Sequence, residues 1–587
     1  MNDYRRGIQQ AIFHGVRNCI HTEGAFTYRI SYIRPIEVEP DSIADLERIK
    51  KRLFKEIARR NNARLDKYPD VKIPRINETT PFKIGTFSTE DGDFSNDAGR
   101  FSLFPLEFIC KKCGKIFETN NTKGLSELPN RCDDCGGKLE QNTIALYCEN
   151  CGTISQMGCF CGVAGHGTRY AHINRSTKDD ISTWTTYCQK CKEMGGQPVD
   201  FLRYKCKACK TGKRKPLPVR DGELYTPVSI TLIDLQDKPK GESSDYLRIA
   251  MESGVITNED LISKINGAID VSEDLATNIQ NVMDLGTIPA LSSKLKDAYQ
   301  YLQVKTNEMK TLYAGVELDS LNDVNFIKNT SISIDNYLKT LPSDEYDSLN
   351  GWYQQAKESY GLYDIRYADN LKVVMSSIGQ ILGMNKFYEE GFVPHFEPFR
   401  EKWNEPGIYA MVVPITTEGI LFKLNPIKVC RWLFKNKLLP KELTSLAEAK
   451  STISRFKEDT DQYVAVKTLV HTLSHILIKQ SNVYTGLDEN TCAELIFPLD
   501  ASFLIYSTSN VNIGGFEYAF DYSLPNWFSR IAEAAEDCTF DPTCMNEGGK
   551  CFSCLYVAEF VCCNFNNDLS RQTLIGGPKY EYGFWKI

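Results

Sequence analysis

The sequence predicts a multidomain α+β protein with a cysteine-rich, zinc-ribbon-like N-terminal region, a helical middle, and a mixed α/β C-terminal domain that carries a four-cysteine zinc site. Three observations predict this fold class. The chain has 587 residues, 42% of them hydrophobic, which is enough for several cores. Its 21 cysteines fall mostly into two clusters. Between these clusters the apolar residues change from helical to strand-like spacing.

Composition excludes several classes of protein. With 25% charged and 11% aromatic residues, the chain is neither disordered nor collagen-like. No stretch approaches the roughly 18 apolar residues that a membrane span needs. The first residues, MNDYRRGIQQAIFHG, carry charge and no apolar run, so we do not expect a secretory signal. We therefore expect a cytoplasmic protein with no membrane span and no small-molecule substrate.

We predict four consecutive regions. Residues 1–105 are a mixed region with an amphipathic helix from Asp45 to Asp66, whose apolar residues recur at helical spacing and whose other face is basic. Residues 106–215 are the cysteine-rich region, where metal replaces an apolar core. Residues 216–400 are mainly helical, with a helix from Ser292 to Gly315.

Residues 401–587 form the C-terminal α/β domain. Strand-like runs extend from Ile408 to Ile415 and from Phe503 to Ile513, and a helix from Asp461 to Lys479 lies between them. These patterns predict an α/β layer ahead of the second cysteine cluster.

Cysteine spacing in the first cluster is typical of zinc knuckles. Thiols in the cytosol stay reduced, so clustered cysteines indicate metal ligands rather than disulfides. Twelve of the 21 cysteines form six close pairs: Cys110/Cys113, Cys132/Cys135, Cys148/Cys151, Cys159/Cys161, Cys188/Cys191 and Cys206/Cys209. Two Cys-x-x-Cys knuckles can close one structural site.

The pairing of these knuckles has more than one solution. The first two pairs fit a zinc ribbon, and each is followed by a glycine, Gly114 or Gly136. The last two pairs predict a second site. The middle four cysteines are ambiguous because His166 and His172 are rival ligands, and an interleaved arrangement of all twelve thiols also fits. We expect up to three structural zinc ions; disulfides, redox thiols and an iron–sulfur cluster are the alternatives.

A basic segment accompanies the last knuckle. Residues 111–220 hold 19 Lys/Arg and 10 Asp/Glu, a local net charge of +9 in a chain whose net charge is -7. A rigid basic patch attracts phosphates, so we predict a nucleic-acid contact here; a solvated basic loop is the alternative. The predicted contact residues are Arg203, Lys205, Lys207, Lys210, Lys213, Arg214, Lys215 and Arg220.

The second cluster contains six cysteines, of which four suffice for one zinc ion. It comprises Cys538, Cys544, Cys551, Cys554, Cys562 and Cys563. The knuckle formed by Cys551 and Cys554 is expected to contribute, but spacing alone does not select the other two ligands. The remaining cysteines, Cys19, Cys430 and Cys492, stand alone and are expected to be buried apolar residues.

The second cluster resembles the MrfA-type helicase-associated zinc-binding (MZB) domain. That domain's pattern matches Cys538/Asp541/Pro542/Cys544, Cys551/Cys554/Leu555, Cys562 and Asn566/Leu569/Arg571. The likeness covers roughly residues 460–580, including HTLSHILI from His471 to Ile478 and the turn at Gly514, Gly515 and Phe516. It implies that the ligands are Cys544, Cys551, Cys554 and Cys562, with Cys538 and Cys563 as spares, and so about four structural zinc ions in the whole chain.

The chain has no Gly-x4-Gly-Lys-Ser/Thr motif and therefore no cradle for ATP phosphates. In this it is similar to the stand-alone form of the family, the DrmB-like proteins of the bacterial DISARM anti-phage defence system. The resemblance implies a superfamily 2 helicase partner (DrmA-like) and a role in phage defence, and we expect the chain also to contact DNA.

We predict no catalytic centre. His471 and His475 have the four-residue spacing of zinc proteases, but Thr472 stands where their glutamate would be, so we interpret both as core histidines. The function we expect is a non-enzymatic zinc-binding accessory subunit. The alternatives are a purely structural interaction scaffold without DNA contact and an unrecognised metal-dependent nuclease.

Overall fold

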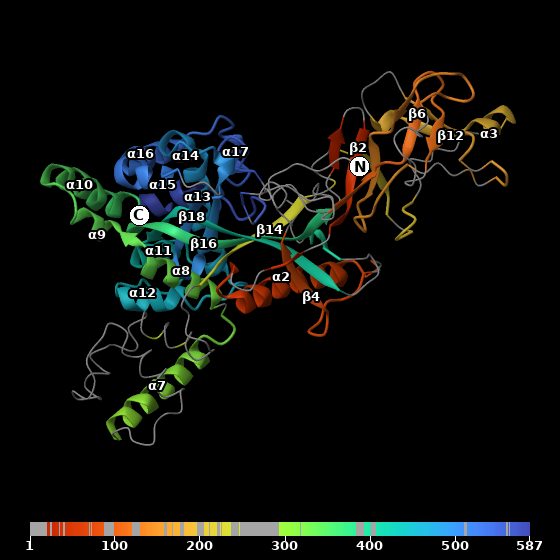
Figure 1. Ribbon diagram of the computed structural model, residues 1–587. Coiled ribbons are helices and arrows are strands. Elements are labelled where there is room, and N and C mark those ends of the chain that lie inside the picture. The colour runs from red at the N-terminus through yellow and green to blue at the C-terminus, as the bar shows by residue number, and fades with distance from the viewer. Residues whose placement is uncertain are drawn as a thin grey trace. The chain divides into compact units, whose positions relative to one another are not determined.

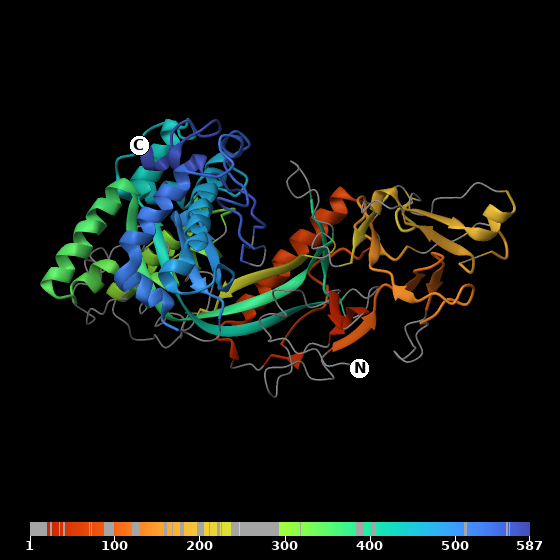
Figure 2. The ribbon, with the colours of Figure 1, turned by 90° about the horizontal axis from the view of Figure 1, so that it is seen from above.

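The computed structural model divides the chain into two compact units, which are described separately (Figures 1 and 2). Unit 1 comprises Met1–Leu232 and Val374–Pro414, and unit 2 comprises Ile233–Val373 and Ile415–Ile587. Helices and sheets are both present, which confirms the mixed α+β fold class. The structure describes residues 20–23, 26–33, 36–38, 42–69, 71, 73–86, 99–119, 130–157, 161, 163–166, 168–175, 181–195, 205–210, 212–219, 224, 226–235, 246, 250, 293–316, 318–382, 393–400, 407–509, 513–558, 561–562 and 564–587.

Unit 1 contains several small antiparallel sheets. Their orders are β1-β2-β5, β7-β6-β8, β10-β9-β13 and β11-β12. Most of these strands are too short to build a core of their own, and the cysteine pairs lie at their ends and in the adjoining turns. The bounds are β1 Ile20–Glu23, β2 Phe26–Ile33, β5 Gly99–Leu103, β6 Glu107–Cys110, β7 Ile116–Glu118, β8 Leu139–Gln141, β9 Ile144–Cys148, β10 Ile154–Ser155, β11 Ala171–Asn174, η3 Ile181–Thr183, β12 Thr185–Cys188, α3 Gln189–Glu193 and β13 Arg214–Pro218.

Helix α2 (Leu46–Lys67) confirms the predicted amphipathic helix. Ile49, Leu53 and Ile57 are fully buried, as expected for apolar residues that recur every three or four positions. Its last turn carries the buried Arg64, which donates to the carbonyl oxygens of Phe396 (2.9 Å) and Cys151 (2.8 Å). The helix therefore supports one of the cysteine turns directly. The helix packs on β17 (His395–Pro398) and β4 (Phe82–Thr86), and β4 pairs with β3 (Ile36–Glu37).

Unit 2 is built on long strands. Strands β16 (Leu362–Leu382) and β18 (Ile408–Leu424) each contribute residues to both units, and the sheet order is β14-β16-β18-β20-β19. In unit 2, β18 pairs antiparallel with β20 (Ser502–Ser507), which pairs antiparallel with β19 (Cys492–Phe497). The predicted strand from Ile408 is confirmed but longer than expected, whereas the one predicted from Phe503 to Ile513 ends at Ser507. Strand β14 spans Thr226–Ile233 and β15 spans Ile332–Ser333.

Helix α13 (Asp461–Lys479) occupies the predicted range. Thr460 caps its N-terminus by accepting from the Tyr463 amide at 3.3 Å. The helix packs on β19, β20 and α16, and its residues from Thr468 to Ile478 are all buried. Figures 1 and 2 show the helices of unit 2 that follow β18, coloured from teal to blue, gathered around it.

Helices α7 to α10 fill most of residues 293–359, including the helix predicted near Ser292, while strands β14, β16 and β17 also lie within residues 216–400. Among the described residues, no helix is long and apolar enough to cross a membrane. The helices of unit 2 are α7 Ser293–Leu312, α8 Asp319–Thr330, α9 Ile334–Leu338, α10 Ser343–Ser359, α11 Pro426–Lys435, α12 Leu446–Ile453, α13, α14 Ser481–Thr485, η5 Glu489–Thr491, η6 Pro498–Asp500, α15 Gly515–Tyr518, η7 Ala519–Ser523, α16 Leu524–Glu536, α17 Thr543–Asn546, α18 Gln572–Ile575 and η8 Phe584–Lys586.

Candidate metal centres

The described cysteines of the two clusters fall into groups whose sulfurs face a common point. Within each group the closest Sγ–Sγ separations are 3.5–3.7 Å. A disulfide would bring two sulfurs to about 2.05 Å. Two thiolates held about 2.3 Å from one tetrahedral ion lie about 3.8 Å apart. The thiols are therefore arranged as metal ligands and not as oxidised pairs, and all are free.

The Cys110 group consists of Cys110, Cys113, Cys132 and Cys135, the pairing expected for a zinc ribbon. Each knuckle turns through a glycine with positive φ, Gly114 at 75° and Gly136 at 65°. Burial raises the pKa of the Cys110 thiol, but the amides of Cys113 and Lys112 donate to its sulfur and bring its pKa to about 7. A side chain at Gly137 would lie 2.8 Å from the Cys110 sulfur, so glycine is required there.

The Cys148 group joins two distant knuckles: Cys148, Cys151, Cys206 and Cys209. Strand β9 ends at Cys148 and pairs with β13, which follows the second knuckle, so the sheet brings the two knuckles together. The sulfurs of Cys148 and Cys209 lie 3.7 Å apart, as do those of Cys151 and Cys206. All four residues are buried.

The Cys161 group has three thiols and one imidazole: Cys161, His166, Cys188 and Cys191. The Nδ1 atom of His166 lies 3.2 Å from the Cys191 sulfur and 3.6 Å from the Cys188 sulfur. The rival histidine, His172, lies elsewhere on β11, where its ring stacks on Tyr187 and its Nδ1 contacts the Tyr170 carbonyl oxygen at 3.1 Å. Cys159 lies outside the described residues.

The Cys538 group lies in unit 2 and consists of Cys538, Cys544, Cys551 and Cys554. Arg571 is fully buried, and its contacts show why the sequence pattern includes both Asp541 and Arg571. Its guanidinium donates to both carboxylate oxygens of Asp541, at 2.7 and 2.9 Å, and to the Cys544 sulfur at 3.6 Å. Burial lowers the pKa of Arg571, but these hydrogen bonds raise it above its usual value, so the guanidinium stays charged beside the thiols.

Two parts of the predicted pairing are wrong. Cys188 and Cys191 do not share a group with Cys206 and Cys209, because the β9–β13 pairing places the latter beside Cys148; the interleaved alternative describes the order better. In the second cluster, Cys538 takes the place that the resemblance gave to Cys562. Cys563 lies outside the described residues.

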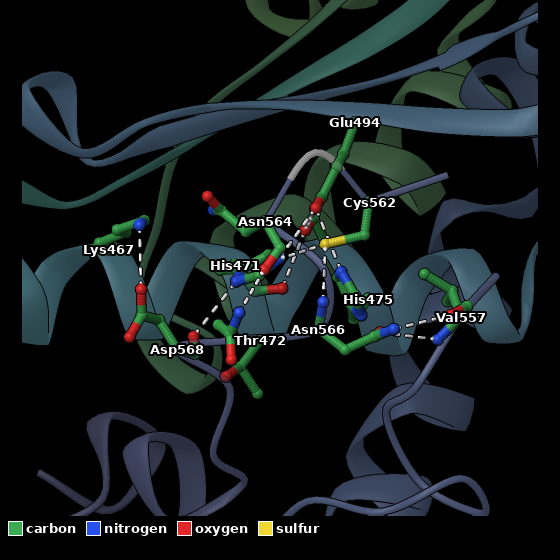
Figure 3. A network of polar contacts seen from close by, with 12 residues as sticks. Lys467, His471, Thr472, His475, Glu494, Val557, Cys562, Asn564, Asn566 and Asp568 are labelled. Atoms are coloured by element: carbon green, nitrogen blue, oxygen red, sulfur yellow. Dashed lines mark hydrogen bonds and ion pairs between the residues drawn. The ribbon is translucent and has the colours of Figure 1, made fainter. Parts of the chain in front are cut away.

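Cys562 instead lies with His471, His475 and Glu494, in the interior of unit 2 (Figure 3). The sequence predicts both histidines to be core residues, and both are fully buried. Glu494 was not predicted, because its carboxylate comes from strand β19 and not from the histidine helix. The only sequence signal was the four-residue spacing of the histidines.

The basic segment surrounds the Cys148 group. Lys205, Lys207, Lys210 and Lys213 are exposed, whereas Arg214 and Lys215 are half-buried on strand β13. Arg203 and Arg220 lie outside the described residues. Four ammonium groups are thus presented to solvent by a short segment that also carries the buried Cys206 and Cys209.

Three comparisons with known proteins each found a similarity. A family described as a domain of unknown function (DUF8724) matches residues 36–225, which include the first three cysteine groups. The chain is 29% identical over 531 residues to the DISARM protein DrmB of Bacillus paralicheniformis, covering 80% of this chain and 88% of that protein. The chain is therefore similar to DrmB over four-fifths of its length.

One solved structure is also similar in part. It is the crystal structure of the DUF1998 helicase MrfA bound to DNA, at 15% identity, a TM-score of 0.18, and coverage of 35% of this chain and 22% of that one. The matched part is less than a quarter of that helicase.

Proposed function

We propose that this DrmB-like protein is a zinc-stabilised accessory subunit of a DISARM-type anti-phage defence system, which partners a superfamily 2 helicase and contacts DNA. The observation that carries the defence role is the similarity to DrmB along four-fifths of the chain. The domain resemblance of the second cysteine cluster supports a helicase partner of the DrmA-like kind.

Zinc is the metal that best fits the cysteine groups. Three groups offer four thiolates and one offers three thiolates and an imidazole, sets that suit zinc in closed tetrahedral structural sites. Every donor comes from the protein, so no position is open for a substrate or a reactive water. The ions would supply folding energy, and the subunit would act by binding rather than by catalysis.

The DNA contact is assigned to the basic segment at the Cys148 group. Lys205, Lys210 and Lys213 are exposed on a short segment with no acidic residue from Arg203 to Arg220. A fixed array of ammonium groups neutralises phosphates and releases counterions, which gives affinity without sequence specificity. The half-buried Arg214 and Lys215 contribute to the same local charge.

The test is binding of the purified, zinc-loaded protein to labelled single-stranded and duplex DNA across a salt series. Reversing Lys205, Lys210 and Lys213 to glutamate is expected to weaken binding at least about tenfold and to lower the slope of log affinity against log salt by about 2–3. Zinc content should not change, because none of these side chains belongs to a metal group.

A matched control reverses three exposed lysines of unit 2, Lys339, Lys435 and Lys457, with the same change in net charge. Equal loss in the control would show that net charge alone governs binding, and no DNA binding at low salt would favour the structural scaffold. Magnesium-dependent cleavage of DNA by the pure protein would favour the nuclease. Both triple variants should still co-purify with the helicase if docking uses a different surface.

A further inference from the structure

The His471 group brings four different donors to one buried point. His471 and His475 lie one turn apart on helix α13, Glu494 lies on strand β19, and Cys562 follows the Cys538 group (Figure 3). The exposed fractions of His471, His475 and Cys562 are 0%, and that of Glu494 is 3%. Their donor atoms all lie within 4.8 Å of one another.

The hydrogen bonds of the two rings determine which nitrogen faces this point. His471 Nδ1 lies 3.2 Å from the Asp568 carbonyl oxygen, and His475 Nδ1 lies 2.8 Å from the Leu555 carbonyl oxygen. A carbonyl oxygen only accepts, so each Nδ1 carries the proton and donates it. In a neutral imidazole the other nitrogen, Nε2, then presents a lone pair.

Both lone pairs point at other electron-pair donors. The Oε1 atom of Glu494 lies 2.9 Å from His471 Nε2 and 3.1 Å from His475 Nε2, and the Cys562 sulfur lies 3.2 Å from His471 Nε2. Lone pairs that converge in a dry interior repel one another unless a cation lies between them. Two buried imidazolium rings would supply protons instead, but that arrangement places at least three charged side chains, the two rings and the Glu494 carboxylate, in the interior without an ion to organise them.

The surroundings match those of a metal site. Histidine ligands commonly donate their other ring N–H to a backbone carbonyl, which fixes the ring and the tautomer, as both rings do here. The Ser474 hydroxyl donates to Glu494 Oε2, which leaves Oε1 for the shared point. The backbone amide of Asn566 donates to the Cys562 sulfur at 3.4 Å, as the backbone amide of Lys112 does to the Cys110 sulfur at 3.4 Å.

We infer that His471 Nε2, His475 Nε2, Glu494 Oε1 and Cys562 Sγ form a fifth metal site, which binds one zinc ion independently of the Cys538 group. Nitrogen and oxygen donors about 2.1 Å from a tetrahedral ion lie about 3.4 Å apart. The observed separations of 2.9 and 3.1 Å are a few tenths of an ångström shorter, so the donors would spread slightly around a bound ion. One carboxylate and one thiolate neutralise a divalent ion, and the mixed set of nitrogen, oxygen and sulfur suits zinc.

This site is closed and therefore structural. It joins helix α13 and strand β19, which are near each other in sequence, to the segment after the Cys538 group, where Cys562 follows Glu494 by 68 residues. The carbonyl oxygen that orients His475 belongs to Leu555, the residue next to Cys554, so the two sites of unit 2 support each other. Removing the ion should loosen the C-terminal segment from helix α13.

The test compares zinc per chain in the full-length protein and in Cys562→Ala, measured by elemental mass spectrometry after dialysis. We expect five ions in the parent and four in the variant. The matched control is Cys492→Ala, which removes another buried cysteine of the same region that belongs to none of the metal groups and should keep five. An equal zinc content in the parent and Cys562→Ala would overturn the site and leave a buried hydrogen-bond network.

A second variant covers the case in which Cys562→Ala does not fold. Glu494→Gln keeps the shape of the side chain but removes the charge, and it should lose one ion or release one to a chelator at least about tenfold faster. Unchanged release would overturn the site. Each test measures a difference of one zinc ion between the parent and a variant. Its outcome therefore does not depend on whether the four cysteine groups bind zinc or on whether the protein contacts DNA.

Discussion

Strands β6 to β13 of unit 1 are two to five residues long, whereas β16 and β18 run for 21 and 17 residues. Around the short strands the buried apolar residues form small separate clusters, which include the metal-group cysteines themselves. Unit 2 has a large continuous core, with Trp432, Trp527 and Phe422 fully buried in it. The candidate metal groups thus take the place of apolar burial in the first region and add to it in the second.

Removing the metal should affect the two regions very differently, and this is the largest effect that we expect. A structural zinc site supplies roughly 10–16 kcal/mol of folding free energy, and little apolar core remains in residues 130–219 without it. We expect dialysis against a chelator to abolish hydrogen-exchange protection there. Strand β18 and helix α11, which rest on the apolar core of unit 2, should keep theirs.

Hydrogen exchange read by mass spectrometry on the full chain reports both regions in one experiment. Re-addition of zinc should restore protection, which controls for irreversible damage. Equal loss in β18 and α11 would show that unit 2 depends on metal as much as unit 1 does.

This contrast explains how much the sequence could predict. Long periodic segments such as residues 461–479 were predicted within a residue or two, because an apolar face defines a helix locally. The Cys110 group was also predictable, since its two knuckles are adjacent in the sequence. The Cys148 group was not, because its pairing depends on β13 returning to lie beside β9.

The C-terminal ligand set shows the same limit. Cys562 was assigned by resemblance to the Cys538 group, but its true neighbours come from a helix and a strand 91 and 68 residues earlier, and only the packing of α13 on β19 brings them together. Short-range spacing identified thiols that lie together in one candidate metal group when they are close in sequence. It had no means to find a ligand such as Glu494.

The next prediction concerns a buried ion-pair cluster in unit 2. The Asp500 carboxylate accepts from Lys328 at 2.8 Å and from Lys423 at 2.6 Å. Burial raises the pKa of Asp500, but the two ammonium groups outweigh it and hold the pKa below its usual value. Asp500→Asn leaves two poorly compensated ammonium groups, which should cost about 3–5 kcal/mol of unfolding free energy near neutral pH.

The contribution of Asp500 to the unfolding free energy should change with pH in a defined direction. Because the folded-state pKa of Asp500 is depressed, its contribution is complete above the unfolded pKa of about 3.9 and is lost as pH falls through the folded value. The full chain is unfolded with denaturant, and hydrogen exchange in β20 reports the unfolding. The unfolding free energy of the parent should approach that of Asp500→Asn only in acid. The exposed Asp459→Asn is the control and should stay within about 0.5 kcal/mol. A neutral-pH loss no larger than that of the control would contradict the role of the ion pair.

The smallest effect comes from removing one methylene group in each region. Ile476 on α13 is fully buried in the continuous core, and Ile173 on β11 is 4% exposed in a small cluster beside the Cys161 group. Replacing either by valine keeps a β-branched side chain, so backbone preference is unchanged. In a dense core the cavity persists, so Ile476→Val should cost about 1–1.5 kcal/mol, whereas the small cluster can collapse and Ile173→Val should cost about 0.5 kcal/mol. Hydrogen exchange in each region measures both losses of unfolding free energy. Equal losses would mean that the residues around the metal groups pack as a true core. Metal would then add to apolar burial there instead of replacing it.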